Sequence, residues 1–267
     1  VISTWQSLHR MPPRYFKQFG CVIGDEAHLF KAKSLTGIMT KLNKCKYRFG
    51  LTGTLDDTQT HRLVLEGLFG KSKYVITTKD LIDNKTLANL DINCIVLQHS
   101  SEDSQKVRDF DYAQELEFII TKPERNDFLV NLMGQYDLLK DKYKDKPIFF
   151  VYGGVNTETR EEIREIIENE KNAIIVASYG TFSTGINIRN IHNIVFSSPS
   201  KSKIRVLQSI GRGLRKTDTK STIRLFDVAD NLNVTDTKVN FSLRHFYERL
   251  KIYKSQQFNY KVNRVKL

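Results

Sequence analysis

Two adjacent acidic residues stand where a short apolar segment ends. Asp25 and Glu26 follow residues 21–24 and precede Ala27 and His28. Open α/β sheets bind ligands in the crevice outside the carboxyl ends of their strands. We therefore predict that Asp25 holds a magnesium ion and that Glu26 polarises a water molecule. Taken alone, these four residues fit equally well a solvated acidic turn in which His28 is an ordinary polar residue.

A second group of chemically suited residues lies far down the chain, at Gln208, Arg212 and Arg215. Phosphoryl transfer needs a metal, an oriented water and cations placed against the developing charge. Two arginines three residues apart share one face of a helix, which suits them as arginine fingers. Gln208 lies one helical turn before Arg212. The alternative is a basic helix that faces solvent or phosphate.

The excess of positive charge is concentrated in the last quarter of the chain. Residues 201–267 contain 16 Lys/Arg and 5 Asp/Glu, which accounts for 11 of the net charge of +12. A concentrated basic field attracts polyanions such as nucleic acid, and interleaved aromatic rings can stack on bases. A solvated basic face with its aromatic residues in the core is the competing interpretation. The aromatic residues concerned are Phe241, Phe246, Tyr247, Tyr253, Phe258 and Tyr260.

Composition places the chain among soluble globular proteins of one large or two ordinary domains. No apolar run approaches the roughly 20 residues that span a bilayer, and the first residues do not form a signal sequence. We therefore expect a cytoplasmic protein with no membrane partner. Cys21, Cys45 and Cys94 have no C-x-x-C spacing, so neither a disulfide framework nor a zinc site is indicated.

Strand and helix patterns alternate along the chain, which predicts an α/β fold with mostly parallel sheets. The predicted strands cover residues 21–24, 47–52, 74–76, 92–97, 148–152, 173–177, 191–196 and 223–228. The predicted helices cover residues 33–42, 58–68, 109–120, 124–143 and 157–168. The polar stretch 100–106 suits the start of a linker. We expect a first lobe over residues 1–100, a linker over 101–123, and a second lobe over 124–267 that ends in a basic helical tail.

In this order, the motifs resemble motifs II, III and VI of superfamily 2 helicases. They are Asp25-Glu26-Ala27-His28, Leu51-Thr52-Gly53-Thr54, and residues 208–216. Residues 178–187 resemble motif V. With residues 3–8 and 151–160, the likeness extends over nearly the whole chain and is strongest to UvsW-type helicases of bacteriophages. XPB-type helicases look like more distant relatives.

The resemblance implies two tandem RecA-like lobes, ATP and Mg²⁺ as cofactors, and DNA as the partner. It implies ATP-dependent remodelling of branched or forked DNA by fork regression, junction migration and R-loop unwinding, in recombination, replication and repair. Single-strand-binding or recombination proteins are implied as further partners. The roles implied for single residues are a catalytic role for His28 and Gln208, coupling by Thr52, Gly53 and Thr54, nucleotide contacts by Gly185, Asn187, Arg212 and Arg215, and nucleic-acid contacts by Thr4, Ser178 and Thr181.

Three departures from the family pattern limit these implications. The chain contains no G-x-x-x-x-G-K-[S/T] loop to grip phosphates, so the first lobe is expected to be truncated at its N-terminal side. Near residues 131–136 the family places an additional strand and loop that this chain lacks. Asn187 stands where many relatives have aspartate, which leaves its ribose contact open. The alternatives are a nucleic-acid-binding module with a degenerate nucleotide site, an RNA helicase, or a restriction-type translocase.

Overall fold

The chain divides into two compact units, which the computed structural model places at Val1–Val75 and Ile76–Leu267. It describes residues 1–30, 32–55, 59–135, 147–170, 173–184, 188–217, 220–233 and 238–267. Within these ranges, no helix combines the length and the apolar character that crossing a membrane requires.

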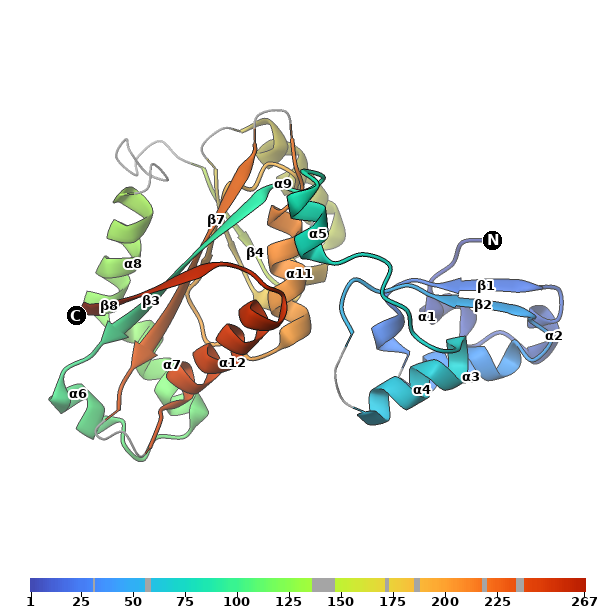
Figure 1. The fold of residues 1–267 in the computed structure, drawn as a ribbon, viewed down its shortest axis with the longest axis horizontal. Helices are drawn as coiled ribbons and strands as arrows, with labels where there is room; N and C mark the ends of the chain where they lie inside the picture. The colour runs from blue at the N-terminus through green and yellow to red at the C-terminus, as the bar shows by residue number, and fades with distance from the viewer. Residues whose placement is uncertain are drawn as a thin grey trace. The chain divides into compact units, whose positions relative to one another are not determined.

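The first unit is built on a two-stranded parallel sheet in which β1 pairs with β2 (Figure 1). Helix α3 and the aromatic residues around it form the core, with Phe16, Leu35 and Met39 buried. The elements are α1 (Trp5–Leu8), α2 (Pro13–Phe16), β1 (Cys21–Gly24), the 3₁₀ turn η1 (Ala27–Leu29), α3 (Lys33–Lys41), β2 (Tyr47–Gly50) and α4 (Gln59–Phe69).

Both strands of this sheet end in a glycine, because aromatic rings pack against the chain there. Gly24 and Gly50 face each other in the register. A Cβ on Gly24 would lie 2.8 Å from the Phe30 ring, and a Cβ on Gly50 would lie 2.9 Å from the Phe69 ring. Phe30 and Phe69 pack edge to face with centroids 5.0 Å apart. The rings fix the point at which each strand stops and its polar motif begins.

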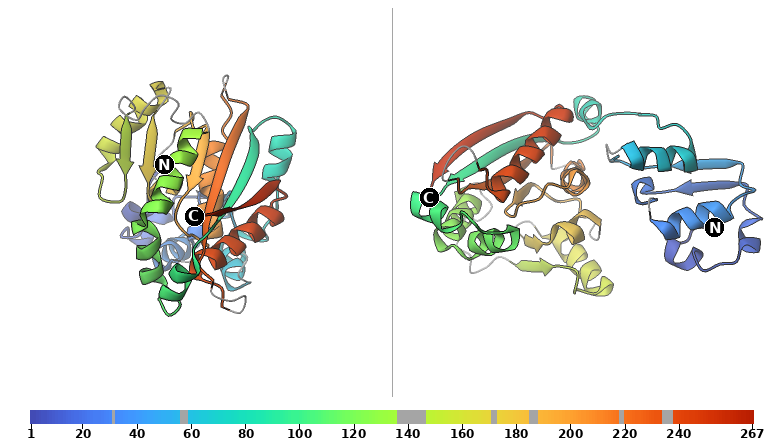
Figure 2. Two further views of the ribbon diagram at one scale, coloured as in Figure 1. Left: turned by 90° about the vertical axis from the view of Figure 1, so that its left-hand side faces the viewer. Right: turned by 90° about the horizontal axis from the view of Figure 1, so that it is seen from below.

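The second unit contains two parallel sheets, one in the order β6-β7-β3-β8 and one formed by β4 and β5 (Figures 1 and 2). Its strands are β3 (Asn89–Gln98), β4 (Ile148–Val151), β5 (Ile174–Ala177), β6 (Asn193–Phe196), β7 (Thr222–Asn231) and β8 (Tyr260–Lys266). Its helices are α5 (Thr78–Asp83), α6 (Ser101–Lys106), α7 (Tyr112–Thr121), α8 (Pro123–Gln135), α9 (Thr157–Asn169), α10 (Tyr179–Thr184), α11 (Lys203–Gly213) and α12 (Phe241–Ser255).

Most predicted elements are found, but the expected lobe boundary differs from the observed division. Strand β3 was assigned to the first lobe, yet it is the middle of the second unit's sheet and pairs with both β7 and β8. Residues 74–76 form no strand and are largely exposed. The polar stretch expected as a linker forms helix α6, capped by the Ser100 hydroxyl. Sequence pattern identified the strand but not its partners, which lie more than a hundred residues away.

The C-terminal tail is also not purely helical. Helix α12 is followed by strand β8, which extends the sheet beside β3. Phe246, Tyr253 and Phe258 are buried in the main core, whereas Tyr247 and Tyr260 remain partly exposed. The tail therefore completes the fold of the second unit, and three of its six aromatic residues are too buried to stack on bases.

Buried ion pairs tie the helices of the second unit to strand β7. Arg249 on α12 donates two hydrogen bonds to Asp227, at 2.9 and 2.6 Å, and both side chains are fully buried. Burial alone would lower the pKa of Arg249, but the charge of Asp227 raises it above the usual value. In the second ion pair, Arg125 on α8 donates a hydrogen bond to Asp230 at 2.7 Å. Burial alone would raise the pKa of Asp230, but hydrogen bonds from His99 and Arg125 keep it low.

Replacing Arg249 by methionine is expected to lower the free energy of unfolding by about 3–5 kcal/mol, because it leaves the buried Asp227 carboxylate unpaired. Chemical denaturation of the purified chain measures this loss. The double variant Arg249→Met, Asp227→Asn removes the unpaired charge as well and should recover a large part of the stability. A single variant as stable as the parent would contradict the assignment of this pair.

Candidate functional site

The acidic motif begins directly after β1, and hydrogen bonds from its backbone N–H groups hold it in place. Asp25 Oδ1 accepts the Glu26 N–H at 2.8 Å, and the Ala27 N–H donates to the Leu51 carbonyl at 2.8 Å, so the motif is anchored to the segment that follows β2. Glu26 adopts a left-handed conformation with φ 48° and ψ 48°, which non-glycine residues rarely occupy. This turn leaves the Asp25 and Glu26 carboxylates exposed beyond the strand end. Local strain of this kind is common at functional sites.

His28 connects the acidic motif to Thr52. Its side chain is buried, and Nδ1 lies 3.0 Å from Thr52 Oγ1 and 3.2 Å from Glu26 Oε2. Thr52 donates its only hydroxyl proton to the Thr54 carbonyl at 2.8 Å. The Thr52 oxygen must therefore accept from His28, which assigns the proton to Nδ1. The result is a continuous path of contacts from the Glu26 carboxylate to the Thr54 backbone, which the sequence did not predict.

Replacing Thr52 by valine is expected to break this path and to lower the free energy of unfolding by about 1–2 kcal/mol, because a part-buried hydrogen bond is lost. The ¹⁵N signals of the His28 ring should shift in the same variant, since Nδ1–H loses its acceptor at 3.0 Å and keeps only Glu26 Oε2 at 3.2 Å. Thr40→Val is the matched control, because the Thr40 hydroxyl donates to the Thr36 carbonyl of its own helix at an exposed position. Unchanged His28 signals in Thr52→Val would contradict the assigned contact.

The residues around this path differ in how far the structure constrains them. Thr54 is buried, and its Oγ1 has no partner among the described residues. Gly53 has open space where a Cβ would stand, so packing does not require glycine there.

Asp25 offers an exposed carboxylate of the kind that Mg²⁺ binds together with waters and substrate phosphates. Within the described part of the chain, no group of three or more metal-ligating side chains occurs.

Helix α11 carries the predicted arginine motif in the second unit. Gln208 and Arg212 lie on the helix and are half-buried, whereas Arg215 follows the C-cap residue Leu214 and is exposed. The expectation that both arginines share one helical face is therefore wrong for Arg215, because the helix ends at Gly213. A Cβ on Gly213 would lie only 1.9 Å from Ile223 Cδ1, so glycine allows α11 to pack directly on the sheet.

Lys220 holds the end of α11 in place, and sequence patterns gave no signal for it. Its side chain is buried and donates to the carbonyl oxygens of Gly213, Arg189 and Ile191, at 2.9, 2.8 and 3.0 Å. The first of these carbonyls ends the arginine helix, and the other two belong to the segment that precedes β6. Lys220 thereby links the arginine motif to the segment that follows residues 178–187.

The hydroxyl residues of the predicted motif V stabilise a short helix. Ser178 Oγ accepts the Thr181 N–H at 3.4 Å and lies 2.9 Å from Thr181 Oγ1, so Ser178 caps α10. Thr181 is buried, whereas Ser178 is exposed. A direct nucleic-acid contact thus suits Ser178 better than Thr181. Thr4 is exposed at the N-cap of α1, with its hydroxyl 3.2 Å from Ser7 Oγ. Gly185 and Asn187 lie outside the described residues.

Comparison with known proteins assigns the family. Residues 105–217 match the helicase conserved C-terminal domain. The chain is 35% identical over 297 residues to the ATP-dependent DNA helicase uvsW of Enterobacteria phage T4, with all of the chain and 59% of the relative covered. A putative ATP-dependent RNA helicase of Acanthamoeba polyphaga mimivirus is 23% identical over 273 residues, covering 94% of the chain and 51% of that protein. The chain thus spans between half and three fifths of the length of these two relatives.

Solved structures agree with this assignment. The crystal structure of T4 UvsW superposes with a TM-score of 0.53 at 32% identity, covering 98% of the chain and 57% of that structure. A DNA-bound Type ISP restriction-modification enzyme, LlaBIII, gives a TM-score of 0.63 at 14% identity, covering 99% of the chain and 23% of that enzyme. At that identity only the fold is shared, and the predicted α/β class with mostly parallel, RecA-like sheets is confirmed. The chain belongs to the superfamily 2 helicases of the UvsW type.

Proposed function

We propose that this chain forms the part of an ATP-dependent DNA helicase that carries the metal-binding carboxylate, the water-activating carboxylate and the arginine fingers. The observation that carries the proposal is the contact path from Glu26 through His28 and Thr52 to Thr54. A solvated acidic turn would not need a buried histidine between two motifs. The path suits a site in which the state of the nucleotide must be sensed by a neighbouring segment.

The assigned roles follow the needs of phosphoryl transfer. Asp25 would bind Mg²⁺, which neutralises charge on the substrate phosphates when bound. Glu26 would orient the attacking water and accept its proton, while Arg212 and Arg215 would stabilise the charge that develops on the transferred group. Gln208 would support Arg212 from one helical turn away. Gly185 and Asn187 remain proposed nucleotide contacts from sequence.

The proposed substrate is branched or forked DNA, with R-loops as a further substrate and single-strand-binding or recombination proteins as partners. The name of the T4 relative supports DNA as the nucleic acid, and the basic excess of residues 201–267 supplies the positive charge that binding requires. The exposed lysines and arginine of strand β8, Lys261, Arg264 and Lys266, suit contact with phosphates. An RNA substrate is the second candidate, since the mimivirus relative is named an RNA helicase.

Equilibrium binding tests the proposed substrate. Fluorescence anisotropy should show tighter binding of the protein that contains this chain to a forked DNA than to a plain duplex, with both affinities falling as salt rises. A matched RNA fork distinguishes the second candidate. Equal affinities for fork and duplex at physiological salt would argue against branched-DNA specificity.

The chain on its own is expected to hydrolyse ATP at a negligible rate, because no phosphate-binding loop is present in its sequence to grip the nucleotide. Phosphate release from the purified chain, measured with and without DNA, checks this. A robust rate that Glu26→Gln abolishes would overturn the expectation and would show that other residues hold the phosphates.

A further inference from the structure

The loop that joins β6 to α11 is held by four side chains, each from a different helix. The carbonyl oxygens of residues 197, 198, 199 and 200 each accept a hydrogen bond from one of them. A loop between a strand and a helix is ordinarily a variable surface segment, so four anchored carbonyls in a row indicate that its position is specified. In the order of these carbonyls, the donors are Arg125 of α8, Tyr179 of α10, Tyr112 of α7 and Arg249 of α12, at 2.5, 3.1, 3.4 and 3.0 Å.

The two arginines fix the ends of this loop to the sheet. Arg125 also donates to Asp230, and Arg249 also donates to Asp227. Both aspartates are buried and belong to β7. The first and the last of the four carbonyls therefore keep a constant position relative to the sheet, whereas the hydroxyl groups of the two tyrosines hold the middle of the loop.

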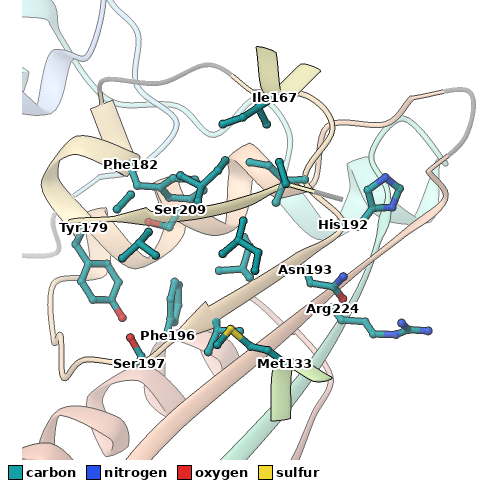
Figure 3. Close-up of a pocket in the computed structure, with 18 of the residues that line it drawn as sticks. Met133, Ile167, Tyr179, Phe182, His192, Asn193, Phe196, Ser197, Ser209 and Arg224 are labelled. Atoms are coloured by element: carbon teal, nitrogen blue, oxygen red, sulfur yellow. The ribbon is translucent and has the colours of Figure 1, made fainter. Parts of the chain in front are cut away.

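Tyr179 holds the Ser198 carbonyl from the first position of α10. Its hydroxyl donates to that carbonyl at 3.1 Å, and its ring packs against the Phe196 ring with centroids 5.2 Å apart. Figure 3 shows both rings on the wall of a cavity in the second unit. Burial raises the pKa of the Tyr179 hydroxyl above its usual value. The hydroxyl therefore keeps its proton at physiological pH and remains a donor.

The residue before Tyr179 is Ser178, the proposed nucleic-acid contact. Ser178 is exposed and accepts the Thr181 N–H at 3.4 Å, which places it at the N-terminus of α10. Nucleic acid bound there would contact the chain one residue away from Tyr179. A shift of α10 on binding would therefore move the Tyr179 hydroxyl, and the Ser198 carbonyl with it.

The same loop leads directly into helix α11. Ser202 caps this helix by accepting the Arg205 N–H at 3.4 Å, and the helix carries Gln208 and Arg212. Residues 199–201 alone separate the Ser198 carbonyl from the cap. A helix moves as a rigid element, so a displacement in the middle of the loop reaches the arginine motif through the start of α11.

We propose that the Tyr179 hydroxyl is a positioning group that couples nucleic-acid contact at Ser178 to the placement of α11 and hence of Arg212. The inference rests on the proposed function, in which Ser178 contacts nucleic acid and Arg212 serves ATP hydrolysis. Helix α10 also packs directly against α11. Loss of the Tyr179 hydroxyl should therefore weaken the coupling rather than remove it.

Tyr179→Phe removes the hydroxyl and keeps the ring, and Tyr112→Phe is its matched control. Tyr112 donates to the neighbouring Pro199 carbonyl but belongs to α7, which contains none of the proposed nucleic-acid contacts. Each variant loses one part-buried hydrogen bond, so both melting temperatures should stay within about 5 °C of the parent.

Hydrogen exchange in the purified chain tests the link directly. Forked DNA at a saturating concentration, checked by fluorescence anisotropy, should change the exchange rates of the α11 amides in the parent and in Tyr112→Phe. The change should be about fivefold smaller in Tyr179→Phe, which corresponds to the loss of one hydrogen bond. Equal changes in all three proteins, or no change in the parent, would overturn the proposal. An equal loss in both variants would show that the loop needs each anchor only for its structure, and the proposal would again be wrong.

ATPase measurements in the protein that joins this chain to a phosphate-binding loop separate the inference from the proposed function. DNA should stimulate the parent and Tyr112→Phe equally, and Tyr179→Phe about fivefold less. Full stimulation of Tyr179→Phe would contradict the coupling and leave the proposed function intact. A parent without DNA-stimulated hydrolysis would contradict the proposed function, while the exchange measurement on the chain alone still decides the role of Tyr179.

Discussion

Arg212→Ala is expected to lower the turnover number for ATP by about three to five orders of magnitude in the protein that joins this chain to a phosphate-binding loop. An arginine finger stabilises charge that appears only in the transition state, so its loss changes kcat far more than nucleotide affinity. Arg212 is the stronger candidate because helix α11 fixes its backbone and Gly213 packs that helix tightly against the sheet. Arg215→Ala should also reduce kcat, and Arg212→Lys should not restore the rate because lysine lacks the planar, bidentate donor group.

The control for this prediction is Arg205→Ala. Arg205 lies on the same helix and is exposed, so its removal changes the charge of α11 equally. Steady-state ATPase kinetics and titration with a fluorescent nucleotide separate kcat from binding. A large loss of nucleotide affinity with little change in kcat would assign Arg212 to ground-state binding instead.

The order of strands and helices could be predicted from sequence because apolar periodicity is local. Helix α9, with its Asn156 cap and acidic first turn, was placed within one residue. The division into units could not be predicted, because it depends on which strands pair. Strand β3 is buried and apolar in either lobe, and only its pairing with β7 and β8 assigns it to the second unit.

The candidate site shows the same difference between local and long-range information. Asp25 and Glu26 could be singled out from sequence because a carboxylate pair after an apolar segment can hold a metal and polarise a water, and their catalytic roles stay predictions. The contact of His28 with Thr52 spans 24 residues and follows from the pairing of β1 with β2. The role of Lys220 could not be predicted, because a lysine between two predicted elements is expected to be solvated. In the structure its ammonium group donates to three carbonyl oxygens. Candidate catalytic residues can be proposed from residue types, but the groups that position them depend on long-range contacts that residue types do not show.

Glu26→Gln is expected to lower kcat for ATP by about two to four orders of magnitude in the same protein, with nucleotide binding retained. Glutamine keeps the size of the side chain and can still accept a hydrogen bond, but it cannot take a proton from the attacking water. The left-handed backbone at Glu26 is set by the strand end and by the anchored Ala27 N–H, so the substitution leaves the turn intact. Pre-steady-state phosphate release measures the chemical step directly.

Glu66→Gln is the matched control, because Glu66 is a carboxylate of the same unit that pairs with Arg62 on its own helix. It should leave kcat unchanged. The Glu26 result also tests the link to Thr52. If the carboxylate acts together with the His28 path, Thr52→Val should reduce the stimulation of ATPase activity by DNA. Glu26→Gln should abolish turnover both with and without DNA. A Glu26→Gln variant that keeps its basal rate but loses only the stimulation would move Glu26 from the chemical step to the coupling path, and another group would have to activate the water.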